Sequence, residues 1–229
     1  MLLLAIDTSA RATAALVRTR EDRTEVLETF STDQVNAHAE VLAPAIAGML
    51  EQAGVSGGEI DRIVVGVGPG PFTGLRVGIA TAQALGFAWG VPVGGACSLD
   101  AIAWEVAAGG AATSRFVTAI DARRRELYWA VYDDAARLID GPHVTAAAEV
   151  AAHPVFGAGA GLYPEQLGAA GAEAMLGWDD RRPDASALAA SAARILNEGG
   201  ELLATTPLYL RESDAKVPAA MLAPKDGAR

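Results

Sequence analysis

Cysteine is almost absent from this chain of 229 residues: Cys97 stands alone, so no disulfide can form within the chain. A single cysteine is typical of proteins from a reducing compartment. Aromatic residues are also scarce, at 6%, whereas hydrophobic residues reach 51%. The core must therefore be built mainly from Ala, Val, Leu and Ile, which favours a tightly packed α/β protein over a disordered or fibrous chain.

The chain also lacks an excess of positive charge, because its formal net charge is −10. A protein that holds nucleic acid unaided usually carries a basic face that displaces counterions from phosphates. Any RNA contact is therefore expected to be local or shared with a partner. The opening residues 1–7 have no basic segment and Asp7 ends their apolar run, so we expect a buried first strand, no membrane span and a cytoplasmic location.

Metal-ligand and nucleophile patterns are missing as well. His38, His143 and His153 are scattered, and none has a second His or a Cys at metal-ligand spacing. Cys97 has no local base beside it, and no serine stands in a nucleophile-elbow motif. We therefore assign no metal site and no catalytic residue to the chain.

The first half of the chain alternates between apolar strands and amphipathic helices. Pro44 is tolerated only in the first turn of a helix, so the helix that contains it is expected to start near Val41 or to kink there. We expect strands over 2–6, 12–17, 26–30, 63–67 and 91–93, and helices over 37–53, over 74–89 and from Ser98, its cap, to 109.

The second half repeats this arrangement. A turn and a strand follow Asp7, and another turn and strand follow Asp121, 114 residues later. Each half also has a later strand that ends in spaced glycines, so the pattern predicts an internal duplication. We expect strands over 116–120, 126–132 and 155–157, helices over 146–152 and 184–198, lobes over 1–110 and 111–213 with the last helix able to pack back on the first lobe, and a flexible tail over 214–229.

The glycine loop over 68–74 follows a strand and opens a helix. Such junctions offer free backbone N–H groups and the positive end of a helix dipole to anions. The loop is not a Walker A loop, because Leu75 and Arg76 follow it where Lys and Ser or Thr are required. Pro69 and Pro71 also remove two N–H donors. The residues leave a shaped turn and an anion contact as two open interpretations.

The turn after the first strand, Asp7-Thr8-Ser9, could hold Mg²⁺ or phosphate as in the actin-like ATPases, or simply form an Asx turn. Its counterpart Asp121 leads into three arginines, residues 123–125, which form a solvated turn or an anion or RNA contact. The paired phosphate loops of an ATPase are thus only half present. The candidate nucleotide or anion contacts are Asp7, Thr8, Ser9, Gly68, Gly70 and Thr73.

The helix after the glycine loop carries a small residue every four positions, at Gly74, Gly78, Ala82 and Gly86. This spacing lets another helix approach closely. Glycine in a helix interior costs about 1 kcal/mol relative to alanine, which suggests a compensating contact. The stripe packs either against the chain's own 41–53 helix or against a partner protein, and the residues leave both open.

Several segments together closely resemble the signature of the TsaB (YeaZ) family. They occur in the family's order and cover nearly the whole chain. The resemblance implies an α/β fold that is a duplicated actin-like (ASKHA, RNase H-like) fold, with two lobes of mixed sheets flanked by helices. The segments are Leu4–Ser9, His38–Pro44, Gly68–Gly78, Asp121–Arg123 with Glu126–Tyr128, and Pro207–Arg211.

The resemblance also implies a non-catalytic scaffold subunit in the formation of N6-threonylcarbamoyladenosine at position 37 of tRNAs that read ANN codons. In the family, the related subunit TsaD carries a metal and ATP and performs catalysis, the ATPase TsaE joins the complex, and TsaC supplies threonylcarbamoyl-adenylate. The chain would contact tRNA only through the complex. A homodimer, and ATP or ADP with Mg²⁺ at a subunit junction, are left open.

Carried over to this chain, the family's partner face lies on the helices over 41–53 and 74–89. Pro71 stands where the family usually has Ser, which weakens a nucleotide contact, and Leu42 stands where TsaD has its second metal-binding histidine. The alternative function is a self-sufficient ATP-dependent phosphotransferase of the actin-like superfamily. The interface residues implied are Leu42, Ile46, Met49, Gly74, Arg76, Gly78, Ala82 and Gly86.

Overall fold

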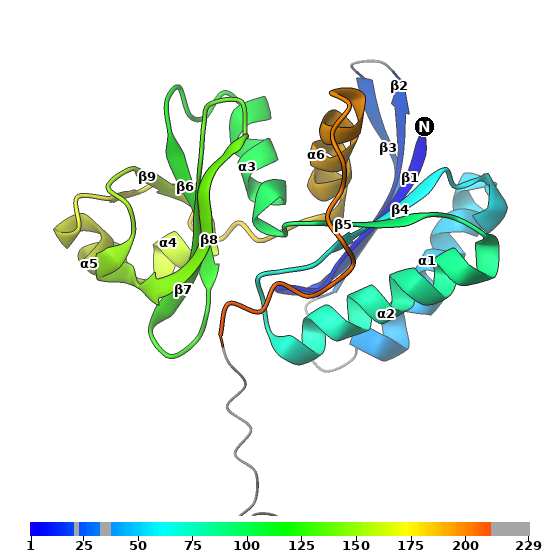
Figure 1. Cartoon of the computed structure of the whole chain (residues 1–229), viewed down its shortest axis with the longest axis horizontal. Coiled ribbons are helices and arrows are strands. Elements are labelled where there is room, and N and C mark those ends of the chain that lie inside the picture. The colour runs from blue at the N-terminus through cyan, green and yellow to red at the C-terminus, as the bar shows by residue number, and fades with distance from the viewer. Residues whose placement is uncertain (21–22, 33–37, 212–229) are drawn as a thin grey trace, which may run out of the picture.

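A computed structural model of the chain describes residues 1–20, 23–32 and 38–211, and shows two lobes side by side (Figure 1). The expected tail over 214–229 lies outside these ranges. The first lobe contains β1 (Leu2–Asp7), β2 (Ala12–Arg20), β3 (Arg23–Thr32), α1 (His38–Ala53), a short 3-10 turn (Gly57–Glu59), β4 (Arg62–Gly66), α2 (Phe72–Trp89), β5 (Val93–Ala96) and α3 (Leu99–Ala108).

The second lobe repeats the order of the five strands, but it has only a 3-10 turn where the first lobe has α1. It contains β6 (Phe116–Asp121), β7 (Glu126–Tyr132), β8 (Leu138–Ala146), a 3-10 turn (Ala147–Glu149), β9 (Pro154–Phe156), α4 (Ala158–Leu162), α5 (Pro164–Ala169) and β10 (Glu173–Ala174), and it is followed by α6 (Ala185–Asn197).

The two sheets have the same topology. The strand order is β3-β2-β1-β4-β5 in the first lobe and β10-β9-β6-β7-β8 in the second. β1 pairs antiparallel with β2 and parallel with β4, and β6 pairs in the same way with β7 and β9. The predicted duplication is therefore confirmed, and Asp7 and Asp121 occupy equivalent positions at the ends of β1 and β6. This is the actin-like, RNase H-like arrangement.

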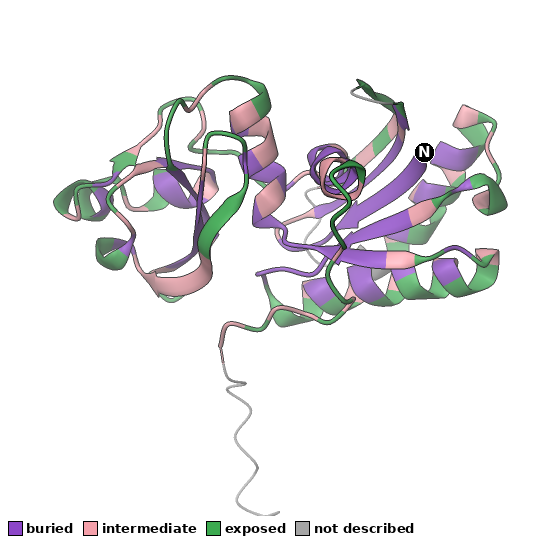
Figure 2. Ribbon diagram, turned by 45° about the horizontal axis from the view of Figure 1, so that its top comes forward, coloured by how far each residue is buried: buried purple, intermediate pink, exposed green. Residues whose placement is uncertain are grey.

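Helices cover both faces of the first sheet, which is why all six residues of β1 are buried. Side chains alternate between the two faces of a strand. Leu4 and Ile6 pack with residues of α1 and α2, whereas Leu3 and Ala5 pack with the alanine-rich side of α6. Figure 2 shows these strands almost wholly buried and the outer sides of α1 and α2 exposed. α6 thus returns the chain to the first lobe.

α3 lies between the lobes. Its residues Leu99, Ile102 and Val106 pack with Phe116 and Tyr132 of the second sheet, and α3 also packs against α6. The lobes therefore share a continuous apolar contact through this helix. No helix among the described residues is long and apolar enough to cross a bilayer.

A C-terminal strap, residues 201–211, follows α6 and runs back along the first lobe (Figure 1). Leu203 exchanges two backbone hydrogen bonds with Gly95 of β5, with N···O distances of 2.7 and 2.9 Å. Leu208 N donates to the carbonyl of Val67 at 2.7 Å. The strap therefore extends the edge of the first sheet and then passes the glycine loop.

α1 spans His38–Ala53, close to the expected 37–53, so it does not start near Val41 and the exposed Pro44 lies inside it. Two other elements differ from the expectation. A helix was expected over 146–152, but only a 3-10 turn forms there, over Ala147–Glu149. Ala146 is instead the last residue of β8, a strand that was not predicted. β8 is a partly exposed edge strand containing Gly141-Pro142, and this dipeptide is an ordinary turn signal.

Candidate functional site

The carboxylate of Asp7 is the centre of the site predicted from the sequence. Asp7 is wholly buried at the end of β1, where the parallel pairing of β1 with β4 places the glycine loop beside it. Asp7 Oδ1 accepts hydrogen bonds from Ser9 N at 2.8 Å and from Ser9 Oγ at 2.6 Å. Asp7 Oδ2 accepts one from Ser98 Oγ at 2.6 Å. Both carboxylate oxygens are thus engaged inside the chain.

The glycine loop fits closely around this carboxylate. A Cβ at Gly66 would collide with Asp7 Oδ2, and a Cβ at Gly70 would lie 2.8 Å from the carbonyl oxygen of Ser9. Gly68 adopts φ +104°, which other residues rarely adopt, and its N–H donates to Ser98 Oγ at 3.3 Å. The glycines therefore let the loop close over the Asp7 turn.

The arrangement does not fit a Mg²⁺-nucleotide held by this chain as described. Burial raises the pKa of Asp7 above its ordinary value, and the hydrogen bonds from Ser9 and Ser98 oppose that shift. A metal ligand must be reachable and negatively charged, whereas Asp7 has no exposed surface. Gly68 and Gly70 are also buried, and Thr73 is the one candidate contact that is exposed.

Thr8 connects the first turn to α2. Its Oγ1 donates a hydrogen bond to the carbonyl of Gly74 at 2.8 Å, and a Cβ at Gly78 would collide with the same Oγ1. Ser98, expected to cap α3, stands at the N-cap but makes no side-chain cap bond, because its hydroxyl is used by Asp7 and the loop. Sequence reasoning placed Ser98 correctly and missed this use.

The small-residue stripe on α2 faces the chain's own core. Gly78, Ala82 and Gly86 are buried, and a Cβ at Gly86 would collide with Val93 of β5. Leu42, Ile46 and Met49 of α1 are buried in the same core, at 0%, 1% and 5% exposure. The expectation that these six residues contact a partner directly is therefore corrected, since packing within the first lobe already covers them. Gly74 is half-buried and Arg76 is exposed.

The same helices present a second surface, which we call the outer face. Alanines surround one aromatic ring on it, that of Phe87, which is 92% exposed. Its residues are Ala43, Ala47, Ala80, Ala84, Phe87 and Ala88, all exposed. An exposed apolar surface of this kind marks a candidate protein-binding site.

An aromatic and arginine cluster joins α2 to the strap. Phe72 and Tyr209 stack with ring centroids 5.0 Å apart, and Arg76 lies over the Phe72 ring at 3.8 Å. Arg76 Nε also donates to Tyr209 Oη at 3.0 Å. The segment Pro207–Arg211 predicts the family but not this contact.

The turn of the second lobe is built differently from that of the first. Asp121 Oδ1 accepts a hydrogen bond from Arg123 N at 2.7 Å, and Asp121 Oδ2 forms an ion pair with Arg123 Nη1 at 3.1 Å. No buried serine takes part in either contact. The two equivalent aspartates therefore do not form a matching pair of phosphate loops.

A partly buried polar pair, wholly buried Tyr132 with half-buried Asp100, was not anticipated from the sequence. Tyr132 Oη donates to Asp100 Oδ1 at 2.7 Å where α3 meets the second sheet. Burial raises the pKa of Asp100 to about 6, and the hydrogen bond from Tyr132 and the charge of Arg194 limit the shift. Within the described ranges, no three His, Cys, Asp or Glu side chains come together as a metal site.

Comparisons with known proteins identify several relatives of this chain. A family model described as "TsaD: tRNA N6-adenosine threonylcarbamoyltransferase" matches residues 25–175. An uncharacterized protein of Mycobacterium tuberculosis is 42% identical over 215 residues, 93% of each chain. The tRNA threonylcarbamoyladenosine biosynthesis protein TsaB of Escherichia coli is 34% identical over 140 residues, 58% of this chain and 55% of the relative. The solved structure of YeaZ from Pseudomonas aeruginosa superimposes with a TM-score of 0.73 at 29% identity, covering 91% of this chain and all of that one.

Proposed function

The chain belongs to the TsaB (YeaZ) family, and on that basis we propose that it is a non-catalytic subunit in the formation of N6-threonylcarbamoyladenosine in tRNA. In the finer form of the proposal, it docks and activates a TsaD-like catalytic subunit that modifies position 37 of tRNAs reading ANN codons. TsaE then joins this complex, and tRNA is engaged within it.

The observation that carries the non-catalytic role is the engagement of Asp7. An actin-like phosphotransferase needs its first turn and its loop open to a phosphate and a metal. Here Ser9 and Ser98 occupy both carboxylate oxygens, and the glycine loop closes over them. The loop therefore acts as a structural junction that positions α2.

The outer face of α1 and α2 is the proposed docking surface for the catalytic subunit. Ala84 and Phe87 lie within it and are exposed, whereas the stripe on the opposite side of α2 anchors the helix to the sheet. A flat alanine surface with one protruding ring suits close helix packing and a central anchor residue. Anchoring on one side and docking on the other make α2 a rigid platform.

Co-purification with a TsaD homologue tests this proposal. Ala84→Glu and Phe87→Glu should each weaken the heterodimer at least tenfold, because a carboxylate would be desolvated in an apolar contact. Leu176→Glu is the matched control, since Leu176 is 90% exposed in the second lobe. Normal co-elution of both α2 variants would overturn the docking proposal. Turnover of Mg·ATP by the isolated chain would instead support the phosphotransferase.

A further inference from the structure

The turn between β6 and β7 contains three consecutive arginines with left-handed backbone. Arg123, Arg124 and Arg125 have φ values of 62°, 54° and 63°. This conformation is unfavourable for residues with a Cβ, and glycine or asparagine normally occupies it. Unusual backbone of this kind is a reason to look for a function of the side chains.

The carboxylates of this hairpin are already engaged by arginine. Asp121 pairs with Arg123, and Glu126 forms an ion pair with Arg211 of the strap. Arg211 Nη1 also donates to the carbonyl of Ala122 at 2.9 Å. The turn exposes Arg124 and Arg125 as well, so the hairpin and strap together carry more positive than negative side chains.

The strap carries this positive surface on toward α2. Tyr209, two residues before Arg211, stacks on Phe72 and accepts a hydrogen bond from Arg76. Phe72 and Tyr209 remain 48% and 43% exposed. In Figure 1 the end of the strap lies between the turn below β7 and the first turn of α2. We name this surface the basic ridge: Arg76, Arg123, Arg124, Arg125 and Arg211, with Phe72 and Tyr209.

We propose that the basic ridge is a direct RNA-binding surface of this chain, with the arginines on phosphates and the exposed rings beside unstacked bases. Guanidinium groups bind phosphate oxygens in pairs of parallel hydrogen bonds. Alternation of arginine and exposed aromatic rings is typical of surfaces that bind single-stranded nucleic acid. The exposed rings favour RNA over an acidic protein as the ligand, because an acidic protein would need only the positive charge of the arginines.

A local ridge also fits the charge of the whole chain. With a net charge of −10, most of the surface repels RNA, so a basic strip would orient the RNA as well as bind it. The inference rests on the proposed function, since it assigns the tRNA of that function a direct contact here. It places the contact on the second lobe, the strap and the first turn of α2, whereas the outer face lies on α1 and on the later turns of α2.

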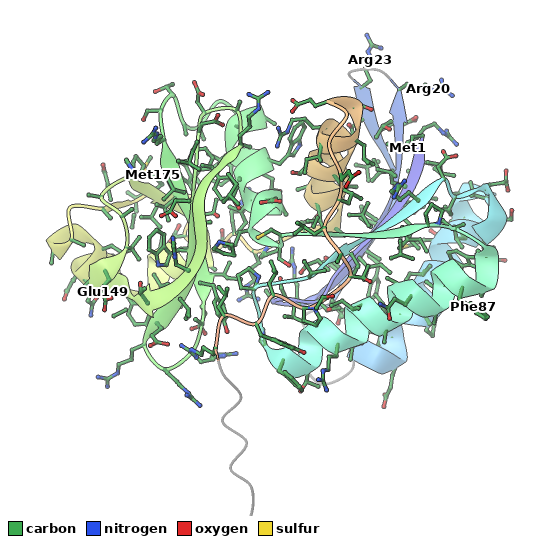
Figure 3. All side chains as sticks on the ribbon, viewed as in Figure 1. Met1, Arg20, Arg23, Phe87, Glu149 and Met175 are labelled. Atoms are coloured by element: carbon green, nitrogen blue, oxygen red, sulfur yellow. The ribbon has the colours of Figure 1, made fainter. Side chains whose placement is uncertain are left out.

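The test measures binding of an unmodified tRNA transcript to the complex with the TsaD homologue. Arg124→Glu with Arg125→Glu reverses the charge at the turn. The matched control is Arg20→Glu with Arg23→Glu, an equal change of charge on exposed arginines at the far end of the β2–β3 hairpin (Figure 3). Filter binding over a range of salt concentrations gives affinity and salt slope, and co-elution gives heterodimer formation.

We expect the turn variant to bind tRNA at least tenfold more weakly, with a salt slope that is shallower by about 0.7 for each single-strand phosphate it no longer neutralises. Its heterodimer and the control pair should be unaffected. Arg124→Lys with Arg125→Lys, which keeps the charge on the same backbone, should retain most of the binding.

Three results would overturn the inference: unchanged affinity of the turn variant, an equal weakening in the control pair, or failure of the turn variant to form the heterodimer, which would make the turn a protein contact. Absence of a heterodimer in the wild-type chain would instead count against the proposed function. In that case the same binding curves on the isolated chain decide the RNA contact.

Discussion

Ser98 Oγ donates a hydrogen bond to Asp7 Oδ2 at 2.6 Å, which joins residues 91 positions apart. Ser98 Oγ also accepts a hydrogen bond from Gly68 N at 3.3 Å. One hydroxyl therefore connects the end of β1, the glycine loop and the start of α3. Through α3, this contact also holds the element on which the second lobe packs.

Removal of this hydroxyl should destabilise the chain. Ser98→Ala leaves a buried carboxyl oxygen and a buried N–H without their partner, which costs about 1–3 kcal/mol. Urea unfolding followed by circular dichroism measures the change. Ser114→Ala, at an exposed position, is the control and should alter stability by no more than about 0.5 kcal/mol. Equal effects of the two substitutions would contradict the assignment.

Two helix glycines should respond in opposite directions to alanine. A Cβ at Gly78 collides with Thr8 Oγ1, whereas a Cβ at Gly48 of α1 has no neighbour within 4 Å. Gly78→Ala should destabilise by about 1–3 kcal/mol through overpacking. Gly48→Ala should stabilise by up to about 1 kcal/mol through helix propensity. Thermal and urea unfolding of both variants measure the change in free energy of unfolding, and changes of the same sign would contradict the prediction.

A double-mutant cycle isolates the contact between α2 and the first turn. If Gly78→Ala acts by pushing Thr8 aside, Thr8→Ala should relieve part of its cost. We expect a coupling free energy above about 0.5 kcal/mol between the two substitutions. Simple additivity would show that Gly78 is required for another reason.

Asp100 should make stability depend on pH. Its pKa is raised from 3.8 to about 6 in the folded chain, so the folded state binds the proton more tightly than the unfolded state. The contribution of Asp100 to stability should therefore be complete below about pH 4, fall as pH rises to about 6, and stay level above that. The pKa difference alone corresponds to about 3 kcal/mol, and partial exposure of Asp100 reduces the expected fall to about 1–2 kcal/mol.

Asp100→Asn stays neutral and keeps an oxygen for Tyr132, so it should remove this part of the fall in stability. Urea unfolding at about pH 4 and about pH 7 measures the effect. Asp134→Asn, at an exposed position, should leave the fall unchanged. The raised pKa of Asp7 contributes a similar slope to all three proteins and cancels in the comparison. A parallel pH profile of Asp100→Asn and wild type would refute the prediction.

Tyr209 should hold the strap locally. Its ring stacks on Phe72 with centroids 5.0 Å apart, and such pairs contribute about 0.5–1.5 kcal/mol. Tyr209→Ala should speed amide exchange over residues 208–211 up to about tenfold, with little change in Tm, because Leu203 still pairs with Gly95. Tyr209→Phe keeps the ring and removes only the hydrogen bond from Arg76. Its amide exchange should therefore be faster than in the wild type and slower than in Tyr209→Ala. Unchanged exchange in Tyr209→Ala would rule out this anchoring role.

The repeated strand-turn-strand pattern at Asp7 and Asp121 predicted an internal duplication, and the family resemblance identified the fold as actin-like. Buried strands such as Leu2–Asp7 and Glu126–Tyr132 are continuous apolar runs bounded by turn residues, and local composition reveals these. Edge elements were harder, because β8 mixes exposed and half-buried residues around Gly141-Pro142. The alanine-rich stretch over 146–152 follows helix propensity, but Ala146 pairs with Glu126 of β7 and residues 147–149 form only a 3-10 turn.

The candidate site was also predictable from the sequence only in part. The sequence identified Asp7, Ser9 and the glycine loop as candidate contacts, and the parallel pairing of β1 with β4 brings them together at one end of the first sheet. It could not show that Ser98 fills the remaining oxygen of Asp7, because the two residues meet only after β5 has joined the sheet. It could not orient the stripe at Gly78 either, because spacing identifies a close contact and not its occupant.

What the sequence by itself determined is the class of fold, its duplication and the family, because these depend on local periodicity and on short motifs in a fixed order. Only the tertiary structure decided which residues are available for function. Asp7 and the Gly78 stripe are consumed by contacts within the first lobe, whereas Phe87 and the arginines at 123–125 remain at the surface. Burial is a property of three-dimensional packing between distant segments, so no local pattern in the chain could assign it.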